Sequence, residues 1–120
     1  MTGEAAPGPY TENTPVTETA GTPVKLQTIG FTFRANTIVV KPGDSVSLNF
    51  TNCATFQHDF ISPALGVTSK VDIPVSGDAT VTFKAPDKPG KYMFWCNTPS
   101  GPTNPLNHGE RGMTGEIIVQ

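Results

Sequence analysis

The stretch WCNTPSGPTNPLNHGERGM, residues 95–113, gathers one of the two cysteines, one of the two histidines and one of the three methionines of a 120-residue chain. The second histidine, His58, stands in the string FQHDF. Two imidazoles, a thiolate and a thioether together suit copper in a trigonal site with a long axial contact, a geometry adapted to electron transfer. The candidate metal ligands are therefore His58, Cys96, His108 and Met113.

The spacing of these residues allows them to converge on one point. In KYMFWC the side chains of a strand alternate, so Phe94 and Cys96 share one face and the sulfur lies at the rim of the core. Four residues, GERG, separate His108 from Met113, and one turn can present both side chains to the same place. His58 stands where a strand meets a loop, and a sandwich can bring that end beside Cys96.

Short runs rich in β-branched and aromatic residues, each bounded by turn formers, predict strands throughout the chain. KPGD and APDKPG place Pro and Gly where a strand must reverse, and a helical turn is expected only after Phe60. Seven or eight such strands make an all-β sandwich, expected to have Greek-key connections. The runs are Val24 to Phe33, Thr37 to Val40, Ser45 to Asn52, Lys70 to Val75, Ala79 to Ala85, Lys91 to Cys96 and Glu116 to Gln120.

Composition limits the organisation and the partners. Twelve Gly and twelve Pro favour short elements over long helices. Residues 1–21 are rich in Thr, Pro and Glu with little to bury, so they are expected to be a disordered tether, with one domain over residues 22–120. No basic stripe is present, which argues against nucleic acid as a partner, and no run is long and apolar enough for a membrane span or a signal peptide.

Several strings resemble those of one protein family. GKYMFWC resembles the Gly-x-Tyr-x-Phe-x-Cys strand of the cupredoxins, and HGERGMTGEIIV is similar to their His-x-Glu-x-Gly-Met-x-Gly ending. IVVKPGDSVSLNFTN followed by HDF is similar to their earlier strands and first ligand histidine, so the resemblance covers about residues 30–120. It implies a cupredoxin-like Greek-key β-sandwich with one mononuclear type 1 copper, a small electron carrier of the plastocyanin, auracyanin and sulfocyanin kind.

The resemblance also implies a supporting residue and a cellular setting. Asp59 stands where the family often has Asn, whose role is a hydrogen bond to the backbone just after the cysteine, here Asn97 or Thr98. The implied partners are a redox protein donor and a redox protein acceptor. A monomer in the periplasm or outside the cell is expected, with a membrane anchor as one option.

The loop between Cys96 and His108 departs from the family. It holds eleven residues, Asn97 to Asn107, where the simple carriers have two to four. We interpret it as an insertion that leaves the ligands in place, stiffened by prolines at every third position: Pro99, Pro102 and Pro105. Two readings stay open, a loop that reshapes the partner surface beside His108 and a passive surface loop, and the sequence does not distinguish a native loop from a grafted one.

Other functions compete with electron transfer. Cys53 could pair with Cys96 in a copper-free binding sandwich. The immunoglobulin pattern would place the Trp on a strand of its own between the cysteines, whereas Trp95 directly precedes Cys96. A free, partly buried Cys53 thiol is the favoured reading. A copper enzyme would need histidines beyond the two assigned, so no enzymatic activity is expected. Copper storage or delivery remains an alternative.

Overall fold

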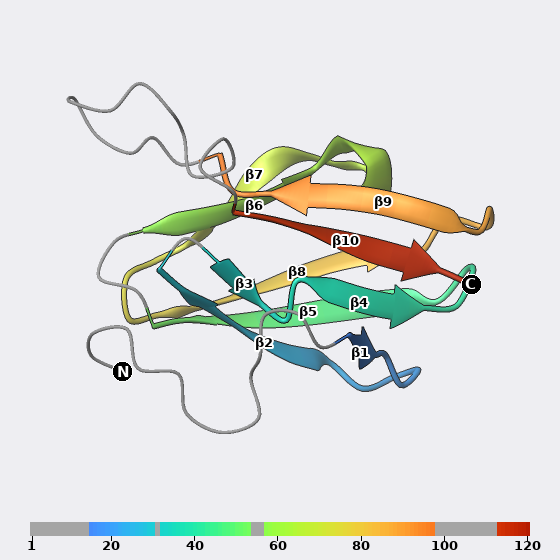
Figure 1. Ribbon diagram of the computed structural model, residues 1–120, viewed down its shortest axis with the longest axis horizontal. Helices are drawn as coiled ribbons and strands as arrows, with labels where there is room; N and C mark the ends of the chain where they lie inside the picture. Colours follow the sequence, from blue (N-terminus) through green and yellow to red (C-terminus); the bar gives the residue numbers. More distant parts are fainter. Residues whose placement is uncertain (1–14, 31, 54–56, 98–112) are drawn as a thin grey trace.

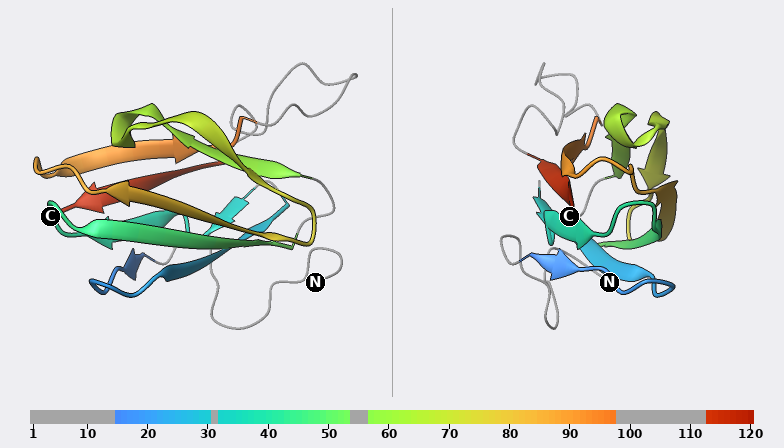
Figure 2. Two further views of the ribbon diagram at one scale, coloured as in Figure 1. Left: turned by 180° about the vertical axis from the view of Figure 1, so that it is seen from behind. Right: turned by 90° about the vertical axis from the view of Figure 1, so that its right-hand side faces the viewer.

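Two β-sheets packed face to face form the domain in a computed structural model (Figures 1 and 2). The structure describes residues 15–30, 32–53, 57–97 and 113–120. The elements in chain order are β1 (Val16–Thr17), β2 (Val24–Ile29), β3 (Thr32–Arg34), β4 (Thr37–Val40), β5 (Ser45–Asn52), β6 (His58–Ser62), the 3-10 helix η1 (Pro63–Leu65), β7 (Val67–Ile73), β8 (Asp78–Lys84), β9 (Gly90–Trp95) and β10 (Thr114–Val119).

One sheet has the strand order β1-β4-β10-β9-β6-β7 and the other β3-β2-β5-β8. Both are mixed: β4 pairs in parallel with β1 and β10, and β2 pairs in parallel with β5, while the remaining neighbours are antiparallel. Figure 1 shows that β9 ends and β10 begins at one end of the sandwich, whereas the turn between β4 and β5 lies at the other. We call these the β9 end and the β4–β5 end.

The strands follow the period-two pattern of the sequence. In β5, SVSLNFTN, every second side chain is buried, and β10 repeats the alternation through Ile117 and Val119. The inward residues of the two sheets meet to form the core, as expected for a sandwich. The expectation of an all-β sandwich is therefore confirmed, and the single helical turn lies after Phe60 as predicted.

The described residues form ten strands, more than the seven or eight expected. The run Val24 to Phe33 is two strands, because Gly30 adopts a left-handed φ of 54° that reverses the chain and lets β3 pair antiparallel to β2. His58–Ser62 was read only as the place where a strand meets a loop, and it is a complete strand. β1 lies before the expected start of the fold at Thr22, in the stretch read as tether, and its two residues pair with β4.

Four phenylalanine rings fill the centre of the core. Phe33 lies 5.0 Å from Phe94, Phe94 lies 4.9 Å from Phe60, and Phe60 lies 5.6 Å from Phe50, measured between ring centroids. They come from β3, β9, β6 and β5, so the cluster joins both sheets, and all four rings are fully buried. Buried aromatic side chains of this size contribute strongly to stability.

Candidate metal centre

His58 and Cys96 meet at the β9 end. His58 begins β6, and Cys96 directly follows β9, its antiparallel neighbour, through the register pair Ile61 and Trp95. The Cys96 Sγ lies 3.7 Å from His58 Nδ1, and both side chains are fully buried. A thiol and an imidazole that are 38 residues apart in sequence are thus brought into contact.

The aromatic cluster explains why these two side chains point into the same space. Phe60 stands two residues after His58 and Phe94 two residues before Cys96, so each ring shares a strand face with one candidate ligand. The two rings stack with an interplanar angle of 27°. Once the rings are packed, strand alternation directs the imidazole and the sulfur to the same side of both strands.

Met113 lies next to Cys96 through the backbone. Its carbonyl oxygen accepts a hydrogen bond of 3.1 Å from the Cys96 N–H, and its side chain is fully buried in the core. Met113 immediately precedes β10, whose first residue, Thr114, pairs with Trp95. The structure therefore brings three of the four candidate ligands, from three adjacent strands, to one end of the sandwich.

Asp59 connects the two strand ends that carry His58 and Cys96. Its Oδ1 accepts a hydrogen bond of 2.6 Å from the Asn97 N–H, and its own backbone N–H donates to Cys96 Sγ over 3.4 Å. The carboxylate contact agrees with the expected partner Asn97. The N–H to sulfur contact was not predicted from the sequence. Every residue except proline has a backbone N–H, so the identity of Asp59 does not indicate this contact.

The N–H donated to sulfur has an electrostatic effect. A hydrogen bond to the charged form of a group favours that form, so the Asp59 N–H favours the thiolate over the thiol. It also withdraws electron density from the sulfur, which is one of the ways in which residues around a metal tune it. Asp59 is fully buried, and its contact with Cys96 Sγ is shielded from water, whereas its contact with the Asn97 N–H is partly buried.

Part of the predicted site lies outside the described residues. His108 and Thr98 fall there, as does the loop Asn97 to Asn107 apart from Asn97 itself. Within the part of the chain that the structure describes, no cluster of three or more His, Cys, Asp or Glu side chains could hold a metal ion. Met113 is not one of these residue types and His108 lies outside the described residues, so the proposed ligands do not form such a cluster.

The contact between sulfur and imidazole fits a shared metal ion. Bonds of roughly 2.3 Å to sulfur and 2.0 Å to nitrogen, as at zinc sites, place the two donor atoms roughly 3.5–3.7 Å apart for angles between tetrahedral and trigonal. The observed separation of Sγ and Nδ1 is 3.7 Å. The soft thiolate also suits copper better than magnesium or calcium.

Cys53 takes no part in this arrangement. Cys53 and Cys96 are both buried and not joined to each other, so the disulfide that a copper-free binding module would need is not formed. The Gln27 side-chain amide donates to Cys53 Sγ over 3.3 Å, and burial raises the pKa of the Cys53 thiol. A neutral thiol with a local hydrogen bond is a packing residue.

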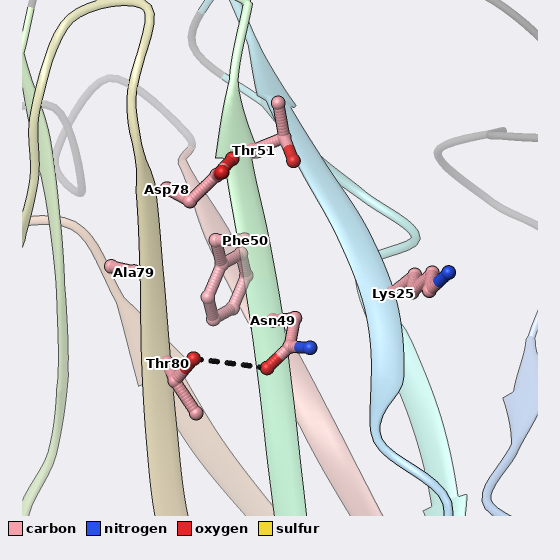
Figure 3. A pocket seen from close by; sticks show the side chains of 7 residues that line it. All are labelled: Lys25, Asn49, Phe50, Thr51, Asp78, Ala79 and Thr80. Atoms are coloured by element: carbon pink, nitrogen blue, oxygen red, sulfur yellow. Dashed lines mark hydrogen bonds between the residues drawn. The ribbon is translucent and has the colours of Figure 1, made fainter.

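A hollow of about 390 Å³ lies elsewhere, on the outer face of the four-stranded sheet (Figure 3). Polar side chains of β2, β5 and β8 line it, and the Thr80 hydroxyl donates to Asn49 Oδ1 over 3.0 Å. Its lining includes neither His58, Cys96 nor Met113. The hollow is therefore separate from the candidate metal centre.

Replacement of Asp59 tests the hydrogen bond that joins the two strand ends. Asp59→Ala removes the buried carboxylate that accepts the partly buried Asn97 N–H, so we expect a loss of about 1–3 kcal/mol in the free energy of unfolding without metal. Asp59→Asn retains a carbonyl oxygen and should lose less than half as much. Urea unfolding measures both, with the exposed Asp87→Ala as the control. Equal stability of Asp59→Ala and the control would contradict the role of this contact.

Comparison with known proteins supports the fold. No family model matches the chain, and no curated protein matches it either. Reduced auracyanin from Roseiflexus castenholzii has 20% sequence identity and a TM-score of 0.66, covering 85% of this chain and 99% of its own. Auracyanin A from Chloroflexus aurantiacus, described as a blue copper protein, has 20% identity and a TM-score of 0.60 over 89% of this chain and 100% of its own.

A third similar structure belongs to a larger assembly. A chain of a heme-copper terminal oxidase dimer has 22% identity and a TM-score of 0.57, covering 81% of this chain and 60% of its own. The protein thus has the cupredoxin fold, as the resemblance of its strands and ligand strings implied. The described residues contain no helix with the length and apolar character needed to cross a membrane.

Proposed function

We propose that this protein binds one copper ion in a mononuclear type 1 site and transfers single electrons. The proposed equatorial ligands are His58, Cys96 and His108, with Met113 as the axial ligand. The observation that carries the proposal is the buried contact of 3.7 Å between Cys96 Sγ and His58 Nδ1, at the end of a cupredoxin fold where Met113 also lies. Bound copper would supply a one-electron couple between its two common oxidation states.

The chain contributes rigidity. The proposed ligands of the described region stand at the ends of β6, β9 and β10, and these strands are fixed by the register pairs and by the stacked rings of Phe60 and Phe94. The backbone bonds from Cys96 to Met113 and from Asn97 to Asp59 hold the same three strand ends together. Ligands that hardly move during a change of oxidation state keep the barrier to electron transfer low.

The groups around the Cys96 sulfur would stabilise the reduced form of a bound copper ion. Cys96 is fully buried, and the Asp59 N–H donates to it, so the thiolate is stabilised by a dipole rather than by water. An uncharged thioether from Met113 would disfavour the more highly charged oxidised copper. Both effects raise the reduction potential.

Redox proteins are the proposed donor and acceptor. The similarity to a chain of a heme-copper terminal oxidase dimer shows that the fold also occurs within a larger redox enzyme. We place the protein in the periplasm or outside the cell, as a monomer held near a membrane through its N-terminal segment. Residues 1–21 would serve as the tether up to the point where β1 joins the sheet.

Copper storage or delivery is the alternative function that the same four ligands could serve. A catalytic function has less support than either electron transfer or storage. The whole sequence has two histidines, and both are assigned, so no histidine remains for a second copper centre. A storage protein should release its metal on reduction or to a chelator. An electron carrier should retain it in both oxidation states.

Copper loading tests the proposal directly. Titration with copper(II) should reach one equivalent and produce an intense visible absorption with the electron paramagnetic resonance signal of a thiolate-bound site. Cyclic voltammetry should then show a reversible one-electron wave, with copper retained after gel filtration of both states. Stoichiometry above one, absence of the visible band, or metal loss on reduction would each overturn the electron-transfer assignment.

A further inference from the structure

Two acidic side chains meet at the β4–β5 end, remote from the candidate metal centre. Glu18 directly follows β1, and Asp44 lies in the turn between β4 and β5. Glu18 is only 8% exposed although it carries a carboxyl group. Carboxyl groups are rarely buried unless they are paired, so the burial of Glu18 indicates a partner or a protonated state.

The two carboxyl groups act on each other. The pKa of Glu18 is raised first by burial, then by a side-chain hydrogen bond with Asp44 and by the charge of that group. Lys41 opposes these effects and lowers the pKa, but it contributes least. Glu18 Oε1 and Asp44 Oδ2 are buried, and within the described ranges neither oxygen has a hydrogen-bond partner.

A small hollow adjoins this pair. It has a volume of about 130 Å³, and Glu18 lines it with the aliphatic Val39 and Val40, the polar Thr17 and Gln120, and the cationic Lys41. If Glu18 and Asp44 were both ionised here, the two carboxylates would repel each other. Burial would also remove water from them, and the ammonium group of Lys41 does not fully compensate for that loss. One proton shared between them removes the repulsion and satisfies a carboxyl oxygen.

The attachment of β1 depends on this corner of the fold. β1 has two register pairs with β4, Val16 with Ile38 and Thr17 with Val39, and the Glu18 N–H adds a hydrogen bond of 2.8 Å to the Val39 carbonyl. β1 is the outermost strand of the six-stranded sheet, so only β4 holds it laterally. Short edge elements of this kind open locally at little cost.

We propose that the buried Glu18 carboxyl keeps its proton while β1 is paired with β4, with Asp44 as the neighbouring acceptor, and that this proton fastens β1 to the edge of β4. Loss of the proton leaves a buried negative charge on Glu18, and β1 detaches while the remaining sheet stays folded. The proton thus controls the attachment of β1, independently of any metal.

The direction of the pH dependence follows from the raised pKa. Because the folded state favours the protonated carboxyl, the stabilisation of β1 is complete below the ordinary value of 4.5 and is lost as pH rises through the higher folded value. Each pKa unit by which the docked state exceeds the ordinary value corresponds to a tenfold change in the docking equilibrium. Attachment should therefore weaken toward neutral and alkaline pH.

Amide hydrogen exchange of the full chain tests this proposal. Protection of the Glu18 N–H, corrected for intrinsic exchange, should fall at least tenfold between pH 4 and pH 8, while protection of β9 amides stays constant. Glu18→Gln removes the titrating carboxyl, so protection should become independent of pH. Asp44→Asn removes the hydrogen bond and the charge of Asp44 but leaves Glu18 buried, so the pH dependence should become weaker and not disappear. The exposed carboxylate of Asp72 supplies the control, since Asp72→Asn should retain the behaviour of the parent.

Three outcomes would overturn the proposal. Protection of Glu18 that does not change with pH in the parent would show that no proton is linked to docking. A pH dependence that survives unchanged in Glu18→Gln would assign the titration to another group. Restoration of protection at pH 8 by millimolar calcium would show that the pair holds a cation and not a proton.

Discussion

Cys96→Ser should abolish the intense visible absorption of the copper-loaded protein, with a loss of at least tenfold in the band. The absorption of a thiolate-bound copper site arises from charge transfer between sulfur and metal, and a serine hydroxyl cannot replace the sulfur. The Cys96 Sγ is the atom in contact with His58 Nδ1 and with the Asp59 N–H, so its removal also ends both contacts. Optical and electron paramagnetic resonance spectra at one equivalent of copper(II) measure the effect.

The chain supplies a matched control for this replacement. Cys53 is the other buried cysteine, and the Gln27 amide donates a hydrogen bond to its sulfur. Cys53→Ser should therefore leave the visible band unchanged, whatever it costs in packing. If Cys96→Ser retains the band, or if Cys53→Ser is the variant that loses it, the proposed ligand set is wrong.

Gly115→Ala should lower the free energy of unfolding by about 3 kcal/mol, the upper part of the usual range for overpacking a core. A Cβ at this position would lie 2.3 Å from Phe94 Cζ, 2.6 Å from Phe94 Cε1 and 2.7 Å from the Asn36 carbonyl oxygen. The ring is held by Phe33 and Phe60, and the carbonyl accepts the Glu116 N–H, so neither neighbour can yield freely. Chemical unfolding without metal gives the free energy.

A double variant separates steric conflict from a general weakness of β10. Phe94→Leu shortens the ring that meets the new methyl group, so Gly115→Ala combined with Phe94→Leu should lose less than the sum of the two single losses. Thr114→Ala, at the exposed neighbouring position, should lie within about 0.5 kcal/mol of the parent. A Gly115→Ala variant as stable as Thr114→Ala would contradict the close packing described for this glycine.

The two predictions are linked through the paired strands β9 and β10. Phe94 stands two residues before Cys96, and Gly115 stands two residues after Met113. A displaced Phe94 ring would shift both strand ends that carry sulfur ligands in the proposed site. Gly115→Ala should therefore also change the visible spectrum of the copper-loaded protein, while Thr114→Ala should not.

The sequence alone was sufficient for the features that arise from local pattern. Strand alternation placed Phe94 and Cys96 on one face, and the structure buries both side chains. The runs in β4 and β5 agree with the observed bounds, because their apolar residues recur with a period of two. The resemblance of the ligand strings led to the cupredoxin fold and to the contact between Asp59 and Asn97.

Tertiary structure decided what depends on the register between distant segments. The pairing of Ile61 with Trp95 sets Asp59 beside Cys96 and makes a backbone N–H a donor to sulfur. The pairing of β1 with β4 carries Glu18 out of a polar N-terminal segment and buries it against Asp44. Residue types and local periods do not encode such contacts, because they form only when strands far apart in sequence pack their faces and share an edge.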